Sequence, residues 1–197
     1  MKKLTELRRI LDEAGLAVEL AGPEVFADVP DIAETGATFA ENALIKARAV
    51  AAATGLPAVA DDSGLCVDAL NGMPGILSAR WAGGHGDDEA NLDLVLRQLA
   101  DIADDRRGAH FACAAALALP SGEAEVVTGE IYGVLLRERR GANGFGYDPI
   151  FRPDGYDRTT AEMDSAEKDA ISHRGKALRA LVPHIAARLE ESSSSSS

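Results

Sequence analysis

The sequence predicts an α/β fold in which helices flank a mixed β-sheet. Amphipathic stretches with helix-capping signals alternate with short apolar runs of strand length, and two longer runs are joined by a Pro-Ser-Gly turn. The 197 residues are enough for a sizeable core. We expect one domain over residues 1–191 and a disordered, low-complexity serine tail at 192–197.

The first part of the chain alternates a helix, a strand and a second helix. Leucines at helical spacing predict a helix over 4–14, and the apolar run 16–20 predicts a short strand. A capping box of Thr38 and Glu41 predicts a helix that ends at Gly55.

An acidic segment, "DDSG" at 61–64, lies between two short extended pieces at 57–60 and 65–70. By itself this segment is typical of a solvated turn, in which an aspartate accepts local backbone N–H bonds. The alternative is a metal and water site at the end of a strand. A further helix is expected over 88–100.

The rest of the chain predicts a hairpin, a loop and two helices. The runs 109–119 and 123–132 flank the Pro-Ser-Gly turn, and a glycine-rich loop covers 139–149. Capping residues at Asp164 and Ser172 predict two C-terminal helices.

Composition excludes several classes of function. The formal net charge of −12 repels polymeric nucleic acid, although a few local cations could still bind a phosphorylated ligand. No apolar run is long enough to cross a bilayer, and no signal peptide is recognisable, so we expect a cytoplasmic protein without a membrane partner. Cys66 and Cys113 are expected to be buried, reduced thiols, and the histidines lack zinc-ligand spacing.

Two carboxylates are candidates for metal binding. Asp61 and Asp62 are adjacent, and adjacent strand residues point to opposite faces, so we expect only one of them in a given site. Glu34 has no local capping role, unlike Glu41, and is the better second ligand. Oxygen ligands of this kind suit Mg²⁺, and an aspartate there could also deprotonate a water.

Four basic residues are candidates for phosphate binding. Lys46 shares the apolar face of its helix, so its ammonium either snorkels to water or points into a cleft. Lys168, His173 and Arg174 surround a predicted helix N-terminus, which favours an anion. The alternative for these three is solvated surface charge.

The glycine-rich loop contains Phe145, Gly146, Tyr147 and Asp148. The aromatic rings could stack on a nucleobase, and Asp148 could accept hydrogen bonds from a ring N–H. The alternative is an ordinary loop with one buried aromatic residue. Carboxylates, cations and an aromatic loop together indicate a nucleotide-processing enzyme.

Five motifs of the chain can be compared with known families: "ETGATFAENALIKA", "ADDSGL", "GMPGILSARWAG", "GFGYDPIF" and "AEKDAISHRGKAL". Together they resemble the inosine triphosphate pyrophosphatase family, whose members hydrolyse non-standard purine nucleoside triphosphates to the monophosphate and pyrophosphate. The resemblance implies an elongated, two-lobed fold with the active site in the cleft between the lobes, a homodimer, Mg²⁺, and the substrates ITP, dITP and XTP.

The resemblance also implies roles for individual residues. Asp62 matches the general base, and Glu34 with Asp62 matches the Mg²⁺ ligands. The base-recognition loop corresponds to 145–148. The residues matched to phosphate or nucleotide contacts are Lys46, Ser63, Lys168, His173 and Arg174.

The sequence departs from the family at its beginning. The family opens with a strand that ends in a Ser/Thr-x-Asn-x-x-Lys motif, whose loop holds the triphosphate. Lys3 matches the lysine of that motif and is thereby implied to bind the substrate, while the preceding residues of the motif are absent. One alternative to the pyrophosphatase is therefore a nucleotide-binding protein of weak or no activity. A second alternative, independent of this departure, is an enzyme for a different nucleotide, such as a pyrimidine or modified triphosphate.

Overall fold

A computed structural model describes residues 2–26, 29 and 32–194. The chain divides into two compact units, each of which is assembled from separate stretches of sequence. The first unit comprises Met1–Asp62, Ala114–Gly129 and Arg174–Ser197, and the second comprises Ser63–Cys113 and Glu130–His173.

A four-stranded antiparallel sheet confirms the α/β class. Its strands follow one another in sequence order, and β3 and β4 pair through Gly133 and Pro153 among others. The predicted sheet was mixed, whereas the described strands are antiparallel. The strands are β1 (Ala58–Val67), β2 (Gly108–Ala118), β3 (Ala124–Leu135) and β4 (Phe151–Pro153).

Two sequence predictions about strands were wrong. The apolar run 16–20 is irregular and half-exposed, and the Leu20 carbonyl accepts a hydrogen bond from Arg8 at 3.2 Å instead of a strand partner's N–H. The segment 61–64 is not a turn, because β1 runs through it without interruption. An apolar run forms a strand only where a neighbouring strand pairs with it. Charged residues can belong to a strand where other side chains neutralise their charge.

The predicted helices are present, with small shifts at their ends. Thr38 accepts a hydrogen bond from the Glu41 N–H at 3.1 Å, and Gly55 ends the helix with φ of 69°, as predicted. The last helix continues to Ser194, into the predicted serine tail, and 195–197 lie outside the described residues. The helices are α1 (Lys2–Glu13), α2 (Phe39–Thr54), α3 (Asp88–Gln98), α4 (Ser165–Ile171) and α5 (His173–Ser194).

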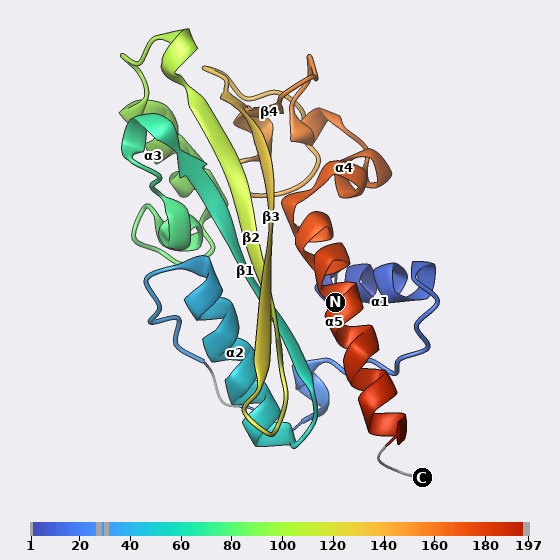
Figure 1. The fold of residues 1–197 in the computed structure, drawn as a ribbon. Helices are drawn as coiled ribbons and strands as arrows, with labels where there is room; N and C mark the ends of the chain where they lie inside the picture. The colour runs from blue at the N-terminus through green and yellow to red at the C-terminus, as the bar shows by residue number, and fades with distance from the viewer. Residues whose placement is uncertain (1, 27–28, 30–31, 195–197) are drawn as a thin grey trace. The chain divides into compact units, whose positions relative to one another are not determined.

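Alanines dominate the core between α2 and the sheet in the first unit. Ala43, Ala47 and Ala51 lie one turn apart on α2, and they pack against Ala114 and Ala116 of β2. Small side chains on both surfaces let the helix approach the strands closely. Helix α2 covers one face of the strands of this unit, while α1 and α5 lie on the other (Figure 1).

Larger side chains form the core of the second unit. Leu92 and Val95 of α3, together with Leu99 directly after it, pack into a cluster with strand residues. In this cluster the rings of Phe111 and Phe151 meet edge to face, with their centroids 4.8 Å apart. This core fixes the scaffold that carries the glycine-rich loop.

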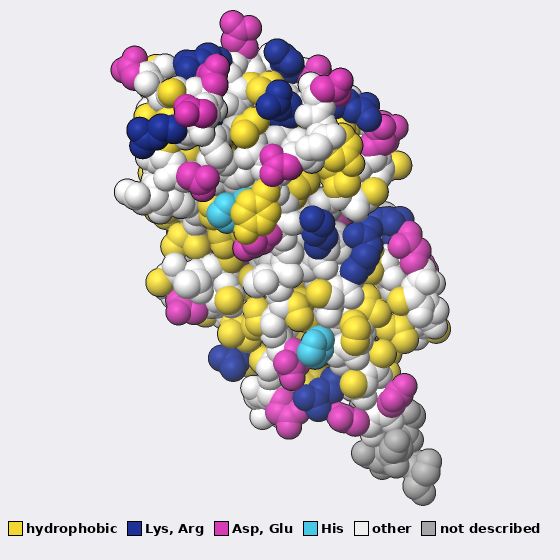
Figure 2. Space-filling model, turned by 45° about the horizontal axis from the view of Figure 1, so that its top comes forward, with side chains coloured by type: hydrophobic (Ala, Val, Ile, Leu, Met, Phe, Trp, Pro, Cys, Tyr) yellow, Lys and Arg dark blue, Asp and Glu magenta, His cyan; other side chains and the backbone are white. Residues whose placement is uncertain are grey.

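Acidic and basic side chains are interspersed on the face shown in Figure 2. No helix in the described part of the chain is long and apolar enough to cross a bilayer. Cys66 and Cys113 are buried and neither forms a disulfide, as predicted for both.

Candidate active site

The first group of predicted site residues lies in the first unit and is centred on an ammonium. The Lys46 Nζ atom of α2 lies 2.7 Å from Glu34 Oε1 and 3.2 Å from Asp62 Oδ1 of β1. Burial alone would lower the pKa of Lys46, but its hydrogen bond to Glu34 and the charges of both carboxylates raise it. Lys46 therefore stays charged, and of the two predicted alternatives the ammonium meets anions rather than snorkelling to water.

Asn42 belongs to the same group, although the sequence analysis did not identify it. Its buried side chain accepts the Gly36 N–H at 2.8 Å through Oδ1 and donates from Nδ2 to Asp62 Oδ2 at 3.1 Å. The first bond fixes the amide orientation, so the second holds Asp62. The signal in the sequence was the spacing, because Asn42 lies four residues before Lys46 and shares its helix face.

Asp61 takes part in a different set of contacts. Its Oδ2 atom accepts Lys3 Nζ and Arg174 Nε, each at 3.1 Å. Burial alone would raise the pKa of the Asp61 carboxyl, but the charges of Arg174 and Lys3 lower it. Lys3 and Arg174, both predicted to contact phosphate, are thus held at Asp61.

The second group of predicted residues lies in the second unit, around the buried Asp148. Asp148 Oδ2 accepts the Phe145 N–H at 2.9 Å and pairs with the Lys168 ammonium, while Oδ1 accepts Thr160 Oγ1 at 2.8 Å. Lys168 Nζ also lies 4.8 Å from the centroid of the Phe145 ring, a cation–π contact. Asp148 therefore anchors the loop and Lys168, and the Phe145 ring is 62% exposed.

The loop around Phe145 depends on its glycines and on a buried tyrosine. Gly144 has φ of +79°, and a Cβ atom there would lie 2.1 Å from the Asp148 carboxylate. The Gly146 N–H donates to Asp88 Oδ2 at 3.0 Å. Tyr147 is buried and donates its hydroxyl to the Ser78 carbonyl at 2.8 Å, so Phe145 is the one of the two predicted stacking rings that faces solvent.

The remaining predicted residues lie outside both groups of contacts. His173 stacks on Phe111 of the second unit, with ring centroids 5.0 Å apart and an angle of 15° between the planes. Ser63 follows Asp62 on β1 and is half-buried. The nucleotide contacts proposed for these two residues stay predictions.

Two carboxylates of the first group offer the donors for a metal. Among the described residues, no cluster of three or more His, Cys, Asp or Glu side chains could hold a metal ion. Glu34 and Asp62 nevertheless converge on one ammonium, so both carboxylates reach the same region. This donor set fits Mg²⁺, which takes one or two carboxylates together with phosphate and water oxygens.

Comparison with known proteins identifies the family. The model of the Ham1 family matches residues 1–184. The chain belongs to the Ham1 family. A dITP/XTP pyrophosphatase of Streptomyces coelicolor is 67% identical over 183 residues, which cover 93% of this chain and 92% of the relative. One of Mycobacterium tuberculosis is 58% identical over 185 residues, 93% of this chain and 90% of the relative.

Solved structures of Ham1 proteins have the same fold. A dITP/XTP pyrophosphatase from Mycobacterium abscessus superposes with a TM-score of 0.80 at 56% identity, covering 93% of this chain and 94% of that one. A HAM1 protein from Coxiella burnetii gives 0.87 at 45% identity, covering 94% of each chain. The resemblance drawn from the five sequence motifs is thereby confirmed.

Proposed function

We propose that this chain hydrolyses non-standard purine nucleoside triphosphates, such as dITP, XTP and ITP, to the monophosphate and pyrophosphate. Ham1 relatives at 58–67% identity carry the name dITP/XTP pyrophosphatase, which supports this activity. The observation that carries the proposal is the arrangement of Glu34, Lys46 and Asp62, because it supplies carboxylates for a base and a cation for phosphate.

Asp62 is the proposed general base. Asn42 and Lys46 each donate to one of its oxygens, which orients the carboxylate. A water attacks the α-phosphorus and gives its proton to Asp62, and the bond to the bridging oxygen breaks, so pyrophosphate leaves with the electron pair. Lys46 stabilises the negative charge of the phosphates during this step.

Glu34 and Asp62 are the proposed ligands of Mg²⁺. When bound, the ion neutralises triphosphate oxygens, which lowers the barrier to attack by an anionic nucleophile. With the two carboxylates bound to the ion, the Lys46 ammonium would interact with the phosphates instead of with Glu34 and Asp62. Removal of divalent cations with EDTA is expected to abolish hydrolysis, and added Mg²⁺ is expected to restore it.

Phe145 and Lys168 are the proposed base-binding pair. The exposed ring of Phe145 offers a stacking surface, and Lys168, held by Asp148, offers a donor beside it. A 6-oxo purine presents an acceptor at O6, whereas adenine presents an amino donor at this edge. The Lys168 donor would have no acceptor on adenine, and this unpaired group disfavours binding of ATP. This assignment moves Lys168 from the phosphates, where the sequence analysis placed it, to the base.

The test is a substrate panel at equal concentrations, with pyrophosphate release as the readout. We expect dITP, XTP and ITP to be hydrolysed and ATP to be spared. Asp62→Asn is expected to lower kcat by about 10²–10⁴-fold, the usual contribution of a general base. Asp61→Asn is the matched control, since it changes the adjacent carboxylate, and a smaller loss is expected there.

Full activity in Asp62→Asn would contradict the assignment of the base. Nucleotide binding without pyrophosphate release in the unmodified chain would favour the alternative of a binding protein, which the names of the relatives do not favour. We also propose a homodimer on the strength of the resemblance, and light scattering after gel filtration tests it directly.

A further inference from the structure

A cavity lined by arginines lies in the second unit, and none of its lining residues is assigned to the reaction. Its volume is about 330 Å³, at the lower end of the range of small-molecule pockets. Four arginines and two carboxylates are among its lining residues. This excess of positive charge contrasts with the net charge of −12 on the whole chain.

Arg107 contributes a buried positive charge to this cavity. It is 2% exposed, and its guanidinium donates to the carbonyls of Leu135 at 2.8 Å, Leu99 at 2.6 Å and Leu136 at 3.0 Å. Within the described part of the chain, Arg107 forms no ion pair with a carboxylate, so its charge is hydrogen-bonded but not neutralised. A buried charge of this kind favours an anion nearby.

Arg137 and Asp104 form a fixed part of the wall. Arg137 Nε lies 2.7 Å from Asp104 Oδ1, and the same guanidinium donates to the carbonyls of Ala100 and Ile102. Burial and repulsion from Arg137 lower the pKa of Arg107, and Asp104 opposes them. An arginine remains charged at neutral pH despite such a shift.

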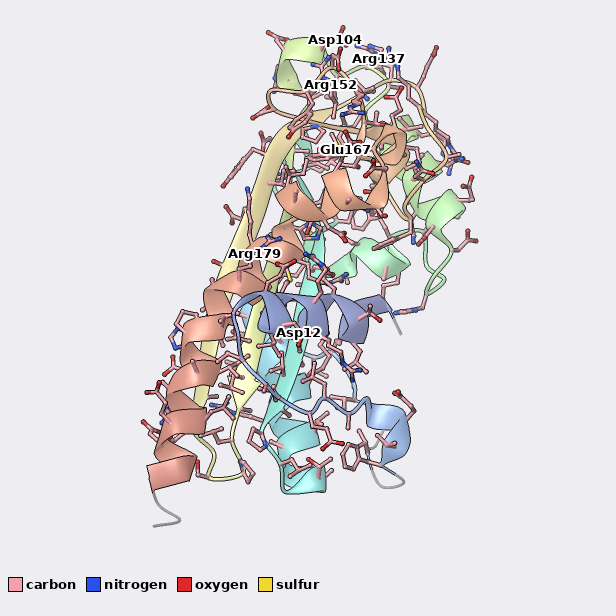
Figure 3. The ribbon with its side chains drawn as sticks, turned by 90° about the vertical axis from the view of Figure 1, so that its right-hand side faces the viewer. Asp12, Asp104, Arg137, Arg152, Glu167 and Arg179 are labelled. Carbon is pink, nitrogen blue, oxygen red and sulfur yellow. The ribbon has the colours of Figure 1, made fainter. Side chains whose placement is uncertain are left out.

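Arg140 and Arg152 are the remaining basic residues of the cavity. Among the described residues, neither guanidinium makes a hydrogen bond or an ion pair, although Arg140 is held through its backbone by Pro149 and Thr159. Figure 3 shows Asp104, Arg137 and Arg152 lying at the same end of this unit. Two guanidinium groups with free donors therefore border a cavity that already holds an unneutralised charge.

We propose that this cavity binds a small phosphate-bearing anion with at least two negative charges, held by Arg140 and Arg152. Guanidinium groups form paired, charge-assisted hydrogen bonds with phosphate oxygens. The ligand is either inorganic pyrophosphate or the phosphate group of a free nucleotide, since both present the same oxygens. The site does not depend on the proposed catalytic activity, and its failure would leave that activity unaffected.

Arginine-specific labelling of the full chain with phenylglyoxal, mapped by mass spectrometry, tests the proposal. Mass spectrometry measures the modification of each arginine separately. Binding of the anion at Lys46 therefore does not affect the readout at Arg140 and Arg152. We expect pyrophosphate, in the presence of EDTA, to slow modification of Arg140 and Arg152 by at least about tenfold relative to chloride at the same ionic strength. Arg48 and Arg97, exposed on α2 and α3, are internal controls and should be unaffected.

Calorimetric titration gives the second readout. The double variant Arg140→Gln/Arg152→Gln should bind the protecting anion at least about tenfold more weakly, because two charge-assisted bonds are lost. Arg48→Gln/Arg97→Gln changes the net charge equally and should bind normally. Protection by a nucleoside diphosphate but not by pyrophosphate identifies a nucleotide as the ligand. Equal protection by chloride, no protection by either anion, or equal weakening in both double variants would overturn the proposal.

Discussion

Asn42 shows how a single buried amide determines the arrangement of the candidate site. It connects the Gly36 N–H to the carboxylate of Asp62 and is fully buried. The charged residues of the site can be identified from their types in the sequence, but the groups that hold them cannot. A hydrogen-bond partner depends on the folded path of the chain, and Asp61 and Arg174 are 113 positions apart.

Replacement of Asn42 by alanine is expected to reduce both stability and activity. The variant leaves the Gly36 N–H without its side-chain acceptor and Asp62 without one donor. We expect the free energy of unfolding to fall by about 1–3 kcal/mol, the penalty of an unsatisfied buried polar group. Urea denaturation measures the first effect and kcat the second. Unchanged values for both would show that Asn42 does not orient Asp62.

The thiol of Cys66 is expected to react slowly. Burial, with a smaller contribution from the charges of Glu130 and Asp68, raises its pKa to about 11. A raised pKa keeps the thiol protonated at pH 8, and only the thiolate attacks alkylating reagents. Alkylation by iodoacetamide, followed by mass spectrometry, should therefore be slow at pH 8 and faster toward pH 11, with the unfolded chain as reference. Equal rates in the folded and unfolded chains at pH 8 would contradict this prediction.

At the scale of elements, local signals predicted structure better than apolar runs did. The ends of α2 followed from the Thr38 cap and from Gly55, because both signals act within one turn. The strand predicted at 16–20 failed, since pairing with a distant strand decides whether an apolar run becomes a strand. β1 was predicted as two pieces for the same reason, because its charges are neutralised by residues distant in sequence.

The alanine face of α2 predicts a sharp difference between two substitutions. Ala47 is fully buried against the sheet, so Ala47→Leu should lower the free energy of unfolding by about 1–3 kcal/mol through overpacking. Ala52 is exposed on the same helix, and Ala52→Leu should change the free energy of unfolding by less than about 0.5 kcal/mol. Thermal or urea denaturation of both variants measures the contrast. Equal free energies of unfolding for the two variants would show that the space between α2 and the sheet accommodates a leucine at position 47 without cost.

At the scale of the whole molecule, charge balance predicts behaviour in solution. The chain carries a net charge of −12 at pH 7, and its isoelectric point is about 4.7. Mutual repulsion weakens as carboxylates take up protons, so solubility should be lowest near pH 4.7. Turbidity measured over a pH series at low salt tests this, and a solubility minimum near neutral pH would contradict it.

The fold class and the family followed from the sequence, but the stretches of chain that make up each of the two units did not. Each unit draws on separate stretches of the chain, such as Met1–Asp62 and Arg174–Ser197 in the first. Hydrophobic periodicity and helix capping depend on residues that are close in sequence. They do not indicate which distant stretches of the chain pack together. The arginine-lined cavity was not predicted for the same reason, since its residues come from 104–107, 134–140 and 152.

The alternation of side chains along β1 places a constraint on insertions and deletions. Asp61 faces Lys3 and Arg174, whereas Asp62 faces Asn42 and Lys46. A shift of one residue in the pairing register would exchange the two faces, bringing a different carboxylate to each set of cations. Changes in length before Asp61 are therefore tolerated in this strand only if an even number of residues is gained or lost.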